Sequence, residues 1–171
     1  MADAPFHLQI VTPEGVQLSE TIDELTAPSV EGQFGVLPGH RPLLAALATG
    51  IISYTKGSTV TQVAVGSGYV EIHADKAVVI TDRFSTKAAI DPVRVRLDLK
   101  EADQALDHFE GDLGGAEHAE LVSRELWAAA LLELYGDPPP PTLRAFSETR
   151  KAEDYAQTAA PSEDAHAGEH E

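Results

Sequence analysis

The chain has 171 residues, of which 43% are hydrophobic and 23% charged, and Asp and Glu outnumber Lys and Arg by 28 to 12, giving a net charge of -16. This acidity argues against a nucleic-acid partner, because a polyphosphate backbone needs clustered positive charge. The absence of cysteine excludes disulfides, thiolate metal ligands and a cysteine nucleophile. No apolar run approaches the roughly 18 residues of a membrane span, and the N-terminus lacks a signal-peptide pattern, so we expect a soluble, unexported chain.

The first predicted unit, residues 1–86, shows the period of β-strands. Apolar residues recur at every second position in segments such as Phe6-Leu8-Ile10, Val16-Leu18, Val63-Val65 and Val70-Ile72. Turn signals separate these segments at Pro13-Glu14-Gly15, Lys56-Gly57-Ser58 and Ala74-Asp75-Lys76. Short, evenly spaced strands of this kind favour an antiparallel sandwich or barrel of about eight to ten strands.

The period changes at Asp91, where Asp followed by Pro92 predicts the start of a helix with an Asp cap. A narrow apolar seam then follows at helical spacing: Val95, Leu99, Ala102, Leu106 and Phe109. After the breaker at residues 111–115, a second helix is predicted to present Ala119, Val122, Leu126 and Ala129 on one packing face, with Gly136 as its left-handed cap. Residues 87–136 therefore predict an antiparallel helical hairpin.

Residues 137–171 begin with the proline run 138–141 and continue as a polar, acidic segment without apolar periodicity, which predicts disorder. Within this tail, His166, Glu169 and His170 match the H-x-x-E-H pattern of certain zinc proteases. That chemistry needs a stable helix and a third ligand, whereas Gly168 interrupts this segment close to the end of the sequence. A solvated tail is the better interpretation.

Four segments carry a family resemblance: FHLQIVTPEG (6–15), EGQFGVLPGHRPLLAALATGII (31–52), VGSGYVEIHADKAVVITD (65–82) and IDPVRV (90–95). In this order and spacing, the chain resembles the epsilon subunit of the F-type ATP synthase. The resemblance implies a β-sandwich followed by a helical hairpin, in a rotor subunit that binds the gamma subunit and rests on the membrane-embedded c-ring. It also implies a peripheral location on the cytoplasmic face of the bacterial inner membrane.

The second of these segments is rich in glycine and proline, which permit tight turns. From the residues alone, a core loop whose glycines serve only backbone geometry is the plainer interpretation. The resemblance instead implies that this segment belongs to the foot that meets the c-ring and gamma, through Gly32, Gln33, Pro38, Gly39, His40 and Arg41. The family commonly has Glu at the position of Gln33, and the neutral Gln33 lacks the charge of that residue.

The start of the first helix, Ile90-Asp91-x-x-Arg94, resembles the ATP-binding motif of some bacterial epsilon subunits. Those members supply further arginines, yet the corresponding positions here hold Glu101, Glu125 and Ala129, and carboxylates oppose a bound triphosphate. Asp91 as a plain helix cap is the better interpretation. A regulatory nucleotide-binding sensor is kept as the alternative function.

No enzyme motif remains, since the sequence has no P-loop and no nucleophile elbow. Gly66-Ser67-Gly68 resembles the start of a dinucleotide loop, but a strand follows it, so a tight turn or close backbone packing is expected. We expect no catalytic residue, metal or cofactor, because catalysis would belong to other subunits. In several relatives the basic residues of the second helix face an acidic segment of a catalytic beta subunit and block ATP hydrolysis. Here that helix is acidic and is expected to inhibit weakly, with Glu117, Glu120, Glu125 and Glu133 against Arg124.

Overall fold

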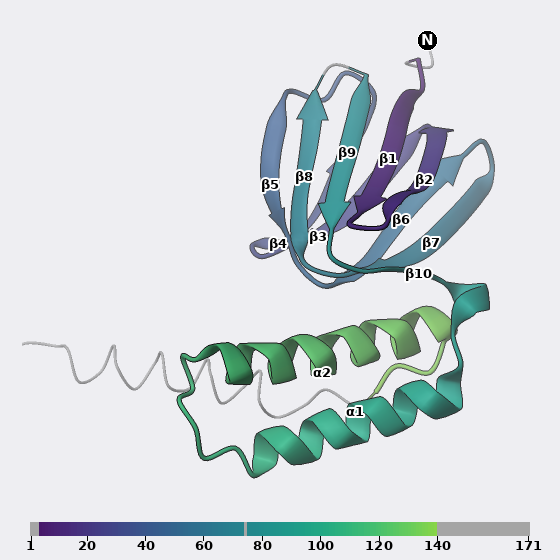
Figure 1. Cartoon of the computed structure of the whole chain (residues 1–171). Helices are drawn as coiled ribbons and strands as arrows, with labels where there is room; N and C mark the ends of the chain where they lie inside the picture. Colours follow the sequence, from purple (N-terminus) through teal and green to yellow (C-terminus); the bar gives the residue numbers. More distant parts are fainter. Residues whose placement is uncertain (1–3, 74, 140–171) are drawn as a thin grey trace, which may run out of the picture. The chain divides into compact units, whose positions relative to one another are not determined.

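The structure is a computed structural model that describes residues 4–73 and 75–139 (Figure 1). The tail predicted to be disordered is residues 137–171, of which the structure describes 137–139; residues 140–171, with the H-x-x-E-H pattern, lie outside the described residues. The described chain holds ten strands followed by two α-helices, as the sequence predicts. The strands are β1 (Phe6–Thr12), β2 (Gly15–Ile22), β3 (Glu24–Ser29), β4 (Gly32–Val36), β5 (Leu43–Leu47), β6 (Gly50–Lys56), β7 (Thr59–Val65), β8 (Gly68–His73), β9 (Lys76–Thr81) and β10 (Phe84–Thr86).

The strands form one strongly bent sheet with the order β10-β7-β6-β3-β5-β8-β9-β1-β2, and β4 pairs with β3 beside this path. All pairs are antiparallel except β1 with β9. The sheet folds over itself so that β2 contacts β6, which encloses one core between two layers. The predicted β-sandwich is thereby confirmed.

The core contains the residues that alternate along the strands, and the largest fully buried side chains include Leu8, Ile10, Ile22, Leu25 and Ile52. Val16 departs from the predicted alternation with Leu18. Along β1 the partners of Ile10 and Val11 are Leu18 and Val16, so Gln17 is the extra residue of a β-bulge. Because the extra residue shifts the alternation of sides along β2, Leu18 and Val16 lie on opposite faces of the sheet. Val16 therefore faces outward and is 56% exposed.

A short 3-10 turn, η1 (Lys87–Ala89), leads into helix α1 (Pro92–Asp107), and helix α2 (Ala116–Tyr135) follows. The predicted caps are present. The Asp91 carboxylate accepts hydrogen bonds from the backbone N–H groups of Val93 and Arg94, at 3.0 and 3.2 Å. Gly136 has φ 105°, and its N–H and that of Asp137 both donate to Leu132 O, which closes the end of α2. The division at residues 86/87 and 136/137 into three units stays a prediction.

The predicted packing face of α2 is wrong. Ala119 and Leu126 are exposed, whereas Ala128 and Leu132 pack with Val95 of α1. Ala130 and Leu134 are also buried but belong to neither hydrophobic cluster. The physical reason is that α2 contacts β6 and β7 as well as α1, so a helix buried on two sides shows no single apolar stripe. The α1 seam is correct through Leu99 and Ala102, but α1 ends at Asp107, so Phe109 lies in the connection, where its ring contacts His118.

Candidate functional site

The residues predicted for the foot do not form one loop. Gly32 and Gln33 begin β4, where they pair with Ser29 and Pro28 across the β3–β4 turn. Pro38 to Arg41 follow the other end of β4, in the connection to β5. The first and last Cα atoms of a five-residue strand are about 13 Å apart, so the structure separates the predicted foot into two parts: the β3–β4 turn and the β4–β5 loop.

The β4–β5 loop is a tight turn with a fixed backbone. The His40 N–H donates to Leu37 O at 3.1 Å, and Gly39 has φ 78°, a region that favours glycine. The His40 ring Nδ1 lies 2.7 Å from the Arg41 carbonyl oxygen. The loop borders an open hollow of about 590 Å³, whose lining is Ala4, Phe6, Pro38, Gly39, His40, Pro42, His73 and Asp75. This end of the sandwich therefore presents a preformed, mixed apolar and polar surface.

The clearest surface feature is one that the sequence analysis missed. Five outward-facing side chains are direct neighbours across five adjacent strands, β5-β8-β9-β1-β2 (Figure 1). Ala46 pairs with Tyr69, Tyr69 with Ile80, Ile80 with Val11 and Val11 with Val16. We call this set the apolar row: Val11, Val16, Ala46, Tyr69 and Ile80.

Three members of the apolar row, Val16, Tyr69 and Ile80, are exposed in the chain by itself, and Val11 and Ala46 are half-buried. Tyr69 is 58% and Ile80 53% exposed, and Leu44, on the same face of β5, is 70% exposed. A contiguous apolar patch of this kind marks a protein contact surface, whereas scattered apolar residues do not. Its signal in the sequence is the run Ala77-Val78-Val79-Ile80, which is apolar at both strand positions, but a run like this equally suits a strand buried on both faces.

The candidate nucleotide residues serve the helical hairpin. Asp91 caps α1 with Oδ1, and Ile90 packs against the cluster of Val95, Ala128 and Leu132. The Arg94 side chain is 78% exposed and lies 4.0 Å from Asp98 Oδ2. Of the three positions compared with the family's further arginines, Glu125 is buried in the hairpin. The structure thus brings Asp91 and Arg94 together at the start of α1, with Arg94 beside Asp98.

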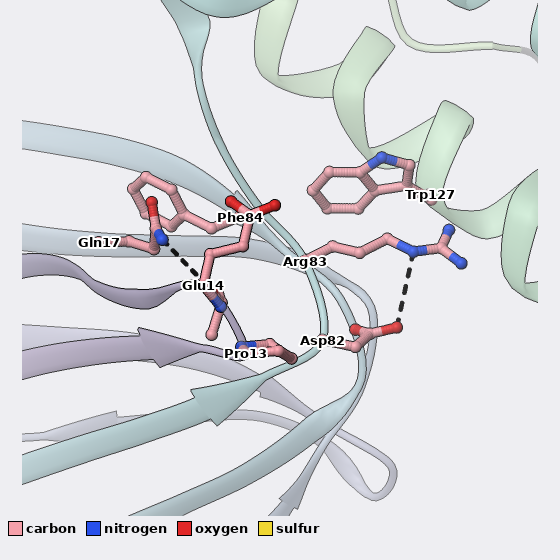
Figure 2. A pocket seen from close by; sticks show the side chains of 8 residues that line it. Pro13, Glu14, Gln17, Asp82, Arg83, Phe84 and Trp127 are labelled. Atoms are coloured by element: carbon pink, nitrogen blue, oxygen red, sulfur yellow. Dashed lines mark hydrogen bonds and ion pairs between the residues drawn. The ribbon is translucent and has the colours of Figure 1, made fainter.

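A second cavity, of about 320 Å³, lies between the β1–β2 turn and α2 (Figure 2). Its lining is Thr12, Pro13, Glu14, Gln17, Asp82, Arg83, Phe84 and Trp127. Arg83 Nε is 3.6 Å from Asp82 Oδ2, and Arg83 Nη2 is 3.7 Å from Glu120 Oε1 on α2. With its one cation engaged by two carboxylates, this cavity does not suit an anionic ligand.

Within residues 4–73 and 75–139, no group of three or more His, Cys, Asp or Glu side chains could hold a metal ion. No helix in the same part of the chain is long and apolar enough to span a membrane. Elsewhere on the sandwich, Lys56 Nζ donates a 2.7 Å hydrogen bond to Glu20, and this bond raises the pKa of the exposed Lys56 ammonium.

Comparison with known proteins agrees with this architecture. Residues 5–87 match the family model described as ATP synthase, Delta/Epsilon chain, beta-sandwich domain. The chain is 34% identical over 118 residues to the ATP synthase epsilon chain of Halalkalibacterium halodurans, covering 69% of this chain and 89% of the relative. This chain belongs to the ATP synthase epsilon chain family. Another member, ATP synthase epsilon chain 2 of Syntrophotalea carbinolica, is 46% identical over 99 residues, which are 58% of this chain and 72% of that one.

Solved structures agree with the epsilon-chain fold. A chain of the Euglena gracilis mitochondrial ATP synthase superimposes with a TM-score of 0.58 at 20% identity, covering 86% of this chain and 84% of its own length. A chain of the Tetrahymena thermophila mitochondrial ATP synthase, from a structure of the central stalk and c-ring, superimposes with a TM-score of 0.51 at 15% identity. The match covers 79% of this chain and 99% of that one. The epsilon-family match therefore confirms the resemblance inferred from the sequence and does not favour the nucleotide-sensor alternative.

Proposed function

We propose that this chain is a non-catalytic subunit of the rotor in a proton-translocating F-type ATP synthase, where it joins the gamma subunit to the c-ring. Membership of the epsilon chain family supports the complex. The observation that carries the proposal is the apolar row, because an exposed apolar surface across five strands suits a permanent protein partner. Gamma is the partner that we assign to this row.

The two parts of the predicted foot are assigned to the c-ring and to the edge of the gamma contact. The β4–β5 loop, with Pro38, Gly39, His40 and Arg41, offers a turn whose backbone is already fixed, so little conformational entropy is lost on docking. The β3–β4 turn brings exposed Gly32 and Gln33 together with Val30, which is 71% exposed. Gln33 is neutral, so the contact at this position would rest on hydrogen bonding and shape.

In this role the chain needs no cofactor, and ATP synthesis takes place on other subunits. It would transmit rotation of the c-ring to the catalytic part as a peripheral protein on the cytoplasmic face of the bacterial inner membrane. The helical hairpin would be the part that can reach catalytic beta subunits and regulate ATP hydrolysis. Its acidic second helix supports only weak inhibition, since like charges oppose docking to an acidic surface.

Co-purification with gamma tests the proposal. Tagged full-length chain should recover gamma in a one-to-one complex from cells that produce both proteins. The double variant Tyr69→Glu/Ile80→Glu should lose gamma while keeping its melting temperature close to that of the parent, because both side chains are about half exposed. Val60→Glu is the matched control, since Val60 is 65% exposed on β7, away from the row. Full recovery of gamma by the double variant would exclude the apolar row as the gamma site.

A further inference from the structure

Arg83 is a charged residue at the contact between α2 and the sandwich, and hydrogen bonds hold its backbone in place. The segment Asp82-Arg83 joins β9 to β10 and lies beside the Gly66-Ser67-Gly68 turn. The Arg83 carbonyl oxygen accepts hydrogen bonds from Gly66 N at 3.0 Å and from the buried Thr81 Oγ1 at 3.1 Å. Two donors on one carbonyl hold the backbone at the point from which the side chain extends.

Gly66 and Gly68 explain how closely the turn packs against the segment before β10. A Cβ at Gly66 would collide with the Asp82 carboxylate, and one at Gly68 would collide with the Ile80 carbonyl oxygen. The sequence prediction of close backbone packing at this turn is therefore confirmed. Gly66 allows the turn to lie close to Asp82 and Arg83, and Gly68 allows it to lie close to the backbone of Ile80 and Thr81.

From this hydrogen-bonded backbone the Arg83 side chain extends to helix α2. Its Nη2 lies 3.7 Å from Glu120 Oε1, and its Nε lies 3.6 Å from Asp82 Oδ2. Figure 2 shows the side chain beside the indole of Trp127, and the same two residues line cavities of about 320 and 220 Å³. The Arg83 side chain is 27% exposed and that of Glu120 is 66% exposed, so solvent screens the arginine end of the pair less than the carboxylate end.

The apolar part of this contact is small. Ala64 of β7 is fully buried although it lies on the face opposite to the core residues Val63 and Val65. Ala64 lies on β7, a strand that α2 and η1 both contact, and Ala130 of α2 is buried as well. Alanine allows close approach but contributes little buried apolar area, so a polar contact can decide how firmly α2 is held.

We infer that the Arg83–Glu120 ion pair is a latch that holds helix α2 against the sandwich. The backbone of Arg83 is fixed by its hydrogen bond with the Gly66–Gly68 turn. Loss of either charge raises the fraction of chains in which the hairpin is released from the sandwich, without unfolding either part. The latch is an ion pair with open cavities on both sides, so ionic strength sets the fraction of chains with the hairpin released. This property belongs to the isolated chain and does not rest on the binding of gamma.

Thiol labelling of a buried position tests the inference. The sequence has no cysteine, so Ala64→Cys places a single thiol at a fully buried position of β7, a strand that α2 contacts. When re-docking is faster than the chemical reaction, the labelling rate is proportional to the released fraction. At low ionic strength, Arg83→Met and Glu120→Gln in this background should each raise the rate about two- to fivefold, the range expected for a single ion pair of modest strength. The double variant should match either single variant.

Matched controls separate the latch from a general change in charge. Lys56→Met and Glu20→Gln remove the same charges from an ion pair within the sandwich and should leave the labelling rate unchanged. At about 0.5 M salt the labelling rate of the parent should rise to that of the Arg83 and Glu120 variants, because the Debye length is then only a few ångströms. Acrylamide quenching of Trp127, the only tryptophan, gives a second measurement without any cysteine.

Equal labelling and quenching in the parent and both variants would overturn the latch. A rise in the Arg83 variant alone would also overturn it, because the contact would then depend on the packing of the arginine stem and not on Glu120. A comparable rise in the Lys56 and Glu20 controls would show that loss of charge loosens the whole chain. Failure of gamma binding in a separate experiment would leave these outcomes untouched.

Discussion

Truncation of Ile80 is the most quantitative test of the apolar row. Ile80 is 53% exposed in the free chain, so about half of its side chain remains to be buried by a partner. Complete burial of an isoleucine side chain is favourable by about 1.5–3 kcal/mol, so covering the exposed half contributes roughly 1 kcal/mol. Ile80→Ala should therefore weaken the affinity for gamma about fivefold, since 1.4 kcal/mol corresponds to about tenfold.

Ile80→Glu adds a second penalty. In the free chain the new carboxylate would remain partly in water, but beneath gamma it would be buried among Tyr69 and Val11 without a partner charge. An unpaired buried charge costs several kcal/mol, so binding should weaken by at least about a hundredfold. We therefore expect the affinity for gamma to fall from the parent to Ile80→Ala and further to Ile80→Glu. The affinity of Val60→Glu should equal that of the parent.

Calorimetric titration of each purified variant into gamma would give the affinities, and thermal melting of each free chain would show whether its fold is retained. Affinities within twofold of the parent for both Ile80 variants would refute the assignment of the row. Equal weakening by Val60→Glu would refute it as well, because that side chain lies on the other layer of the sandwich. A large drop in melting temperature for Ile80→Ala would show that the residue serves the fold more than its exposure indicates.

Three further predictions concern the foot, the helix cap and the hairpin. His40→Glu should weaken attachment of the chain to membranes that contain the c-ring while its melting curve stays unchanged; unaltered attachment and proton-coupled activity would remove the β4–β5 loop from the interface. Asp91→Ala removes the acceptor of two backbone hydrogen bonds at the start of α1 and should lower the free energy of unfolding of the hairpin by about 0.5–2 kcal/mol, measured by urea denaturation, with Arg94→Ala as a near-neutral control. Truncation after Gly115 should activate ATP hydrolysis of the assembled complex only slightly, because residues 116–136 carry four acids against one base; strong activation at both low and moderate salt would show that α2 inhibits through apolar contacts such as those of Trp127 and Leu131.

Local signals in the sequence were sufficient for the types of the elements and for the helix caps at Asp91 and Gly136. The strand period identified the core residues Leu8 and Ile10, and the caps Asp91 and Gly136 marked the hairpin, because capping depends on a few backbone groups next to the residue itself. The four quoted segments gave the family, which the comparisons confirm. The foot residues could be named, but their division between two ends of β4 required the strand's position and length.

The rest depended on contacts between residues that are far apart in the sequence. A bulge at Gln17 turns Val16 outward, and pairing of β1 with β9 places Val11 beside Ile80, so the apolar row exists only in the assembled sheet. The packing faces of α2 likewise could not be read from its own period, because the helix is covered by α1 on one side and by β6 and β7 on another. The sequence by itself determined which residues are apolar, charged or able to turn the chain. Tertiary structure decided which of those apolar residues stay exposed, and which charge, Arg83, lies between sandwich and helix, since both depend on what covers each side chain.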